Sequence, residues 1–164
     1  MGNISYKPII DDMIWSYSRI KTYEDCPYRF FLKYIKEYED TDRFYSSFGK
    51  FVHELLEEFN RGELTKDEVL AKFLIDFSSN VRGIRPSEQT VQNYISSTSE
   101  YFRELKPLPF NTVAVEKEVS FNIDGYNFIG FIDYIGEKDN KLFIVDNKSH
   151  VSPRSGRVNP TAKD

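Results

Sequence analysis

The first hundred residues repeat apolar side chains every three or four positions, which is the period of an amphipathic α-helix. In the segment 46–62, six apolar side chains share one face of such a helix: Phe48, Phe51, Val52, Leu55, Leu56 and Phe59. Gly62 is expected to end this helix, because glycine readily takes the left-handed conformation of a helix C-terminus.

A proline marks the start of an earlier helix. Pro27 fits the first turn of a helix capped by Asp25 or Cys26, because the missing N–H of proline costs nothing there. A shorter helix, starting at about Ser16 or Ser18, is expected to precede it.

Two further helices carry start and stop signals. Thr65 and Glu68 have the spacing of a capping box at the start of the segment 65–77. The segment 86–105 is expected to form a helix that stops before Pro107.

Beyond residue 111 the apolar period changes from about 3.6 to two, which predicts strands. Four side chains of the first strand point one way (Val113, Val115, Val119 and Phe121), and Lys117 is the exception on that face. The segments 126–135 and 141–148 predict two more strands, and turn sequences separate all three.

The predicted fold class is therefore α/β, with a helical N-terminal half followed by a three-strand antiparallel meander. We expect a single domain over residues 1–150, mainly helical over 15–106 and with strands over 112–148. The segment 151–164 is polar, contains two prolines and has no periodicity, so we expect a loop or tail.

Composition narrows the functional class. The 164-residue chain has a net charge of −4, which argues against a passive nucleic-acid coat but not against an enzyme with an acidic metal site. No segment approaches the ~20 apolar residues of a membrane span. A single cysteine and the absence of a signal-peptide pattern at the start predict a cytoplasmic location.

The clearest candidate chemistry follows the last predicted strand. Asp146 and Lys148 are two residues apart, so on a strand they share a face while Asn147 points away. Asp133 has a similar place near the end of the preceding strand, and pairing of the two strands would bring both carboxylates together. Two carboxylates beside a lysine suit Mg²⁺ or Mn²⁺ and the hydrolysis of a phosphodiester.

Each of these residues also has a simpler interpretation. Taken alone, Asp146 and Lys148 are better explained as an ordinary ion pair at a strand exit, and Asp133 is compatible with a surface residue near a turn. His53 lies on the flank of the apolar helical stripe, where a histidine is most often a boundary residue. A solvated strand face is the better expectation for Glu116 and Glu118, and the alternative is that one of them faces the metal or the DNA.

Four motifs that follow one another along the chain favour the functional interpretation of these residues over the simpler one: "YEDCPYRFFLKY", "FGKFVHELLEEF", "GFIDYI" and "IVDNKS". Together they resemble the RecB-like branch of the PD-(D/E)XK nuclease superfamily, which includes the RecB and AddB nuclease domains and CRISPR-associated exonucleases. The matching positions form three pairs: Gly49 with His53, Gly130 with Asp133, and Asp146 with Lys148.

The resemblance implies a restriction-endonuclease-like core and metal-dependent hydrolysis of DNA, exonuclease-like, in recombination, phage or defence processing. It implies that His53, Asp133 and Asp146 bind Mg²⁺ or Mn²⁺ together with the backbone carbonyl of Asn147. It further implies that Lys148 is the catalytic lysine beside Asp146 and Asp133.

Two departures from the family pattern limit the inference. No Q-x-x-x-Y segment follows Lys148, which implies a truncated product or a fragment and leaves an open sheet edge for a second copy or a protein partner to cover. The alternative is a catalytically incomplete nucleic-acid-binding or assembly module of the same fold; another is an unrelated α+β interaction domain. Because Cys26 is the only cysteine, no iron–sulfur cluster is expected.

The start of the chain interleaves aromatic and basic residues, a pattern typical of single-strand binding. We expect four of them to contact DNA, as single strands or DNA ends: Arg19, Tyr23, Arg29 and Lys33. Core packing is the better expectation for Phe30, Phe31 and Tyr34.

Overall fold

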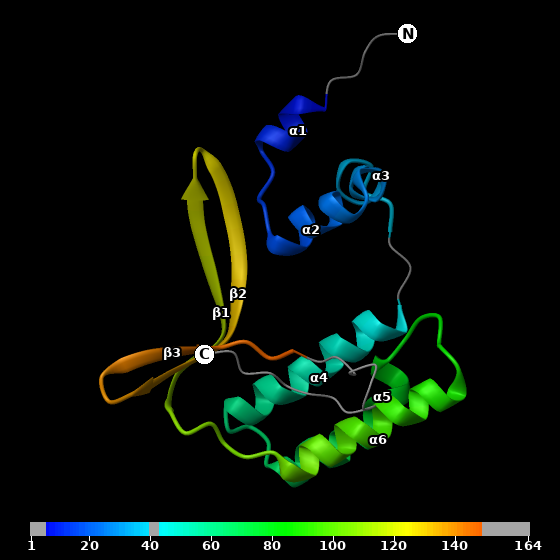
Figure 1. The fold of residues 1–164 in the computed structure, drawn as a ribbon, viewed down its shortest axis with the longest axis vertical. Coiled ribbons are helices and arrows are strands. Elements are labelled where there is room, and N and C mark those ends of the chain that lie inside the picture. The colour runs from blue at the N-terminus through cyan, green and yellow to red at the C-terminus, as the bar shows by residue number, and fades with distance from the viewer. Residues whose placement is uncertain (1–5, 40–42, 149–164) are drawn as a thin grey trace. The chain divides into compact units, whose positions relative to one another are not determined.

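The computed structural model describes residues 6–39 and 43–148, in which helices come first and strands follow (Figure 1). The helical elements are α1 (Lys7–Asp11), α2 (Tyr17–Asp25), α3 (Pro27–Phe30), the π-helical turn η1 (Phe31–Ile35), α4 (Phe44–Asn60), α5 (Lys66–Asn80) and α6 (Glu88–Glu104). The strands are β1 (Asn111–Ile123), β2 (Tyr126–Lys138) and β3 (Lys141–Val145). The predicted fold class is confirmed.

Contacts divide the chain into two compact units. Unit 1 comprises the described residues within Met1–Asp40 and Glu118–Phe131, and unit 2 comprises those within Thr41–Lys117 and Ile132–Asp164. Both β1 and β2 therefore contribute to each unit. The single domain over 1–150 stays a prediction, and the expected tail over 151–164 lies outside the described residues. None of the helices in the described part of the chain is long and apolar enough to cross a bilayer.

The core of unit 2 is formed by α4, α5 and α6. Five of the six apolar residues predicted to share one face of α4 are buried, and Phe59 is partly buried against the same core. The core is rich in aromatic side chains: the ring of Phe73 contacts those of Phe48, Phe51, Phe77 and Phe102. The apolar stripe of the sequence thus determines which side of α4 is buried.

The ends of these helices follow the local signals. The capping box is formed, because the Thr65 hydroxyl accepts from the N–H of Glu68 and the Glu68 carboxylate accepts from the N–H of Thr65. Gly62 follows the end of α4 with a φ of 75°, a conformation that glycine takes without a Cβ clash. The α6 helix ends at Glu104, before Pro107, as predicted.

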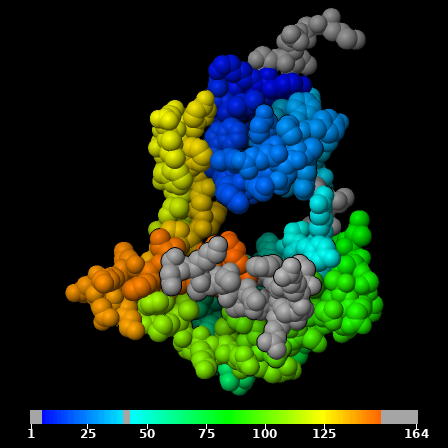
Figure 2. Space-filling view, in the orientation of Figure 1, coloured from blue at the N-terminus to red at the C-terminus, as the bar shows by residue number. Residues whose placement is uncertain are grey.

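In unit 1 the first helices pack against the turn half of the β1–β2 hairpin, Glu118–Phe131, as the blue and yellow atoms show (Figure 2). The N–H of Trp15 donates to the carbonyl of Asn127, and the carbonyl of Trp15 accepts from the N–H of Ile129. The ring of Trp15 stacks on Phe30, which is buried as expected. Phe31 and Tyr34, also expected in the core, are only partly buried.

Side-chain caps define the starts of α2 and α3, for each of which the sequence offered two candidate residues. The Ser16 hydroxyl accepts from the N–H of Arg19 and caps α2. The Cys26 thiol accepts from the N–H of Arg29, so Cys26 caps α3. Cys26 therefore has a structural role at a helix start.

The strands form one sheet in the order β1-β2-β3, joined by two-residue turns. The turn residues Asp139 and Asn140 both have positive φ, as a type I′ hairpin requires. β2 and β3 pair antiparallel, with Tyr134 opposite Val145. The prediction that the third strand reaches residue 148 is wrong, because β3 ends at Val145.

Replacing Phe73 by alanine tests the aromatic core. The side chain is 0% exposed and contacts four rings, so Phe73→Ala should lower the free energy of unfolding by about 3–5 kcal/mol. Urea denaturation followed by circular dichroism measures this loss. The neighbouring Leu74 is 49% exposed, and Leu74→Ala should cost less than about 1 kcal/mol. Equal losses in the two variants would contradict the assignment of the core.

Candidate metal centre

The helix α4 carries His53 on the flank of its buried face. Its neighbour Val52 is buried in the core, whereas the His53 side chain is 31% exposed. Glu57 and Arg61 follow at intervals of four residues, so the three side chains lie along one edge of the helix. Arg61 pairs with Glu57 at 2.5 Å. Burial of the apolar face therefore directs this polar edge away from the core.

Asp133 lies on β2 and is the best-anchored acid of the site. Its neighbour Tyr134 is buried on one face of the strand, so the Asp133 side chain points to the other. The N–H of Asn147 donates to Asp133 Oδ2 over 2.6 Å, and His53 Nδ1 lies 3.8 Å from the same oxygen. The carboxylate thus connects β2 with α4 and with the segment after β3.

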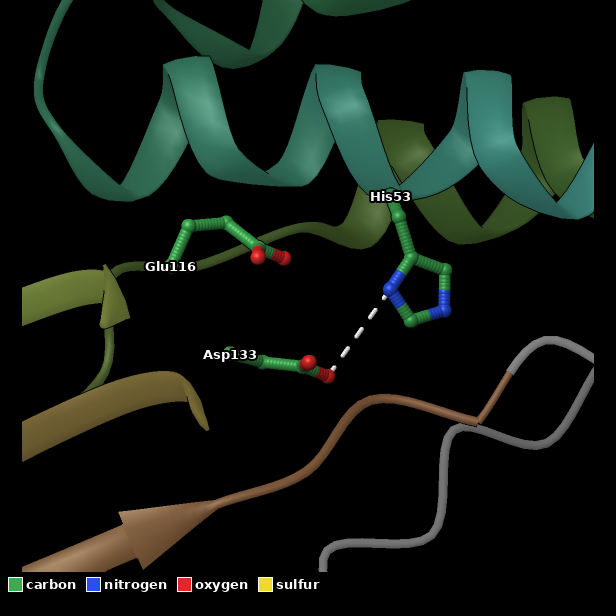
Figure 3. A group of neighbouring side chains, drawn as sticks. All are labelled: His53, Glu116 and Asp133. Atoms are coloured by element: carbon green, nitrogen blue, oxygen red, sulfur yellow. Dashed lines mark ion pairs between the residues drawn. The ribbon is translucent and has the colours of Figure 1, made fainter. Parts of the chain in front are cut away.

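Glu116, on β1, completes a group of three. One ligand atom from each of His53, Glu116 and Asp133 lies within 4.8 Å of the others, and Figure 3 shows the three side chains converging. The expectation that Glu116 lies on a solvated strand face is wrong; Glu118 is exposed as expected.

The backbone of Glu116 explains this correction. Its φ of 50° lies in the left-handed region, which interrupts the strict alternation of side chains along β1. Such residues re-aim a side chain and often occur next to active sites. The sequence carried one signal of this interruption, because Lys117 occupies a position on the predicted apolar face.

The site concentrates negative charge. Burial raises the pKa of Glu116, and the nearby carboxylates of Asp133 and Glu57 raise it further, while His53 and Arg61 act in the opposite direction. A cation would offset this repulsion. One imidazole nitrogen and two carboxylate oxygens fit a divalent ion such as Mn²⁺ or Mg²⁺, so the residues present suit the metal predicted from the sequence.

Asp146 and Lys148 lie beside this group but not within it. Lys148 Nζ is 2.6 Å from Asp146 Oδ2, and both side chains are 59% exposed. Because Tyr134 pairs with Val145, continuing the ladder would put Asp146 opposite Asp133, but the strand ends first. The structure therefore has the ion pair at the strand exit, and Asn147 contacts Asp133 through its backbone N–H.

The four residues expected to bind substrate all lie in unit 1. The Arg19 guanidinium donates to the carbonyl of Ile14 and lies 5.2 Å from the ring centre of Tyr34. Lys33 Nζ lies 5.5 Å from the same ring. The two remaining residues, Tyr23 and Arg29, are exposed. Their contact with DNA stays a prediction.

Replacing Glu116 by glutamine should change the pH dependence of stability. The folded-state pKa of Glu116 lies above its ordinary value of 4.5, so folding loses stability as the pH rises above 4.5 and the carboxyl ionises. Without metal, Glu116→Gln should therefore be more stable than the parent at pH 7, and the difference should vanish below pH 4.5. Thermal unfolding at the two pH values measures this. Glu118→Gln is the matched control and should leave the stability unchanged at both pH values.

Comparison with known proteins identifies a matching family. The model of the PD-(D/E)XK nuclease superfamily matches residues 14–162. Searches of curated proteins and of solved structures each found no match. The superfamily consists of nucleases that act on nucleic acid and typically use divalent metals, in agreement with the donor set of His53, Glu116 and Asp133. The chain therefore belongs to the PD-(D/E)XK nuclease superfamily, and its helices and three-stranded sheet form a restriction-endonuclease-like fold.

Proposed function

We propose that this chain is a Mg²⁺- or Mn²⁺-dependent deoxyribonuclease of the RecB-like branch, with exonuclease-like activity on single strands or DNA ends. The convergence of His53, Glu116 and Asp133 carries the proposal, because three side chains of types that can bind a metal, from three separate elements, meet in one place. The superfamily match and the order of the motifs support it. A role in recombination, phage or defence processing is part of the proposal.

In this proposal three side chains bind the metal and fix its position. Asp133 is oriented by the N–H of Asn147, His53 is held by the packed helix α4, and Glu116 is aimed by its left-handed backbone. The bound cation supplies a Lewis acid that activates water and offsets charge on the phosphodiester.

The exposed pair Asp146–Lys148 is assigned to the substrate side of the site. Asn147 lies between the two residues and bonds to Asp133, so both are tethered near the metal centre. The exposed ammonium of Lys148 can exchange Asp146 for a phosphate oxygen, since an exposed ion pair is worth little. Lys148 would then stabilise the developing charge on phosphate, and Asp146 would be free to serve as a further ligand of a bound cation.

One observation favours a second candidate function. Asp146 lies outside the group of three, so the same fold could bind metal and nucleic acid without completing catalysis. The two candidates differ in one result: a binding or assembly module would bind metal and oligonucleotide but leave the oligonucleotide intact.

Metal binding at the centre should stabilise the folded chain. At a Mn²⁺ concentration of about 100 times the dissociation constant, the free energy of unfolding should rise by about 2.7 kcal/mol. Asp133→Asn should remove most of this gain, because Asp133 supplies a charged ligand. Thermal unfolding with Mn²⁺ and with EDTA measures it. Asp139→Asn, in the exposed β2–β3 turn, is the control; an equal loss in both variants would exclude this site.

Cleavage of end-labelled single- and double-stranded DNA tests turnover. With Mn²⁺ present, Lys148→Ala should lower the rate at least about 100-fold, because it removes the cation that faces the reacting phosphate. Lys138→Ala, at the exposed end of β2, should retain the parent rate. Intact DNA with the parent chain, together with normal Mn²⁺ binding, would instead support the binding module.

A further inference from the structure

A second polar feature of unit 2 lies where the start of α4 meets the end of α5. It is a pocket of about 300 Å³ lined by six residues: Ser46, Ser47, Lys50, Ser79, Asn80 and Arg82. Two of these side chains are cationic and none is acidic. The pocket is distinct from the metal centre, since the two share no residue.

The charged residues that line this pocket are both cationic although the chain as a whole is acidic. A backbone bridge between Arg43 and Ile84 holds the start of α4 and the α5–α6 loop together. Lys50 Nζ lies 3.7 Å from Glu54 Oε1, and this long contact involves an exposed lysine. Such a pair competes weakly with a ligand.

The pocket is built by specific hydrogen bonds. Ser47 Oγ accepts from the N–H of Arg82 and donates to its carbonyl, so the α5–α6 loop is fixed to α4. Arg82 Nε donates to the carbonyl of Ser79. This uses one of five guanidinium donors, and the two terminal amino groups have no further partner among residues 6–39 and 43–148. The Arg82 fork is therefore held in place and able to bind an anion.

The start of α4 and the end of α5, which both lie at the pocket, also affect how well an anion would bind there. Ser46 and Ser47 lie in the first turn of α4, where the helix dipole favours negative charge. The carbonyls at the end of α5 have the opposite effect, but those of Asp76 and Ser79 already accept hydrogen bonds from Asn80 Nδ2 and Arg82 Nε. The cationic side chains therefore dominate.

The pocket and the metal centre lie along one edge of α4. Ser46, Lys50 and His53 are separated by four and three residues, which places them on the same side of the helix. At ~1.5 Å per residue, Lys50 lies ~5 Å and Ser46 ~10 Å along the axis from His53. Both residues therefore lie within about two turns of α4 from His53, close enough for one nucleic-acid strand to reach both places.

We propose that this pocket holds a non-scissile phosphate of the nucleic-acid strand whose scissile phosphate lies at the metal centre. The inference rests on the proposed nuclease function and deepens it. Lys50 and Arg82 neutralise the phosphate charge, and Ser46 and Asn80 complete the polar lining. The subsite sets the register of the strand, so the metal centre meets a defined phosphodiester bond.

This subsite is tested by measuring how well the full chain binds an oligonucleotide after its cationic pocket residues are replaced by uncharged glutamine. Fluorescence anisotropy of a labelled single-stranded oligonucleotide, with EDTA present to prevent cleavage, compares the parent with Lys50→Gln/Arg82→Gln. The matched control, Lys66→Gln/Arg103→Gln, changes the net charge equally at the start of α5 and the end of α6. Lys50→Arg keeps the charge at position 50 and leaves the Arg82 fork intact, so it should bind like the parent.

The pocket variant should bind about tenfold more weakly, and its dependence of log affinity on log salt should be shallower by roughly 0.7, the value for one single-strand phosphate contact. Its Mn²⁺ binding should equal that of the parent, which shows that α4 is intact.

Two results would overturn the inference in different ways. Unchanged affinity and salt dependence in the pocket variant, with DNA cleavage by the parent, removes this subsite and leaves the nuclease function standing. A parent chain that binds Mn²⁺ but no oligonucleotide removes the proposed function and the subsite together.

Discussion

The packing of α4 against α5 and α6 is the interaction on which the candidate site depends. The apolar face of α4 is buried among aromatic rings, so the helix cannot rotate without exposing that surface to water. Its polar edge is fixed as a consequence. His53 and Lys50 both lie on this edge, and a core interaction therefore positions the metal centre and the basic pocket.

The candidate metal centre brings like charges together, which costs electrostatic free energy. Glu116 and Asp133 lie close together, with Glu57 nearby, and Glu116 has a left-handed backbone that costs of order 1–3 kcal/mol. Residues under such strain persist only where the surrounding structure holds them. Here the helix, two strands and the N–H of Asn147 hold the carboxylates together, and a divalent cation would relieve the repulsion.

The parts of the site differ in how they are held. His53 lies on a packed helix, and Asp133 lies on a paired strand with a hydrogen bond to its carboxylate. Asp146 and Lys148 lie on irregular backbone after β3 and are largely exposed. The Asp146–Lys148 pair can therefore rearrange at little cost, as the proposed function requires, whereas moving His53 or Asp133 would disturb the core or the sheet.

The sequence alone determined the order of helices and strands, the buried face of α4, the capping box at Thr65 and the choice of His53 and Asp133 as candidate ligands, which the structure places side by side. These features depend on local periodicity, on capping and on motif order, which are visible along one chain. Only the tertiary structure decided that Glu116 joins these two residues, that β3 ends before Asp146, and that Lys50 and Arg82 share a pocket. The reason is physical: a left-handed residue, the end of a ladder and a contact between distant segments each depend on neighbours that the sequence does not place.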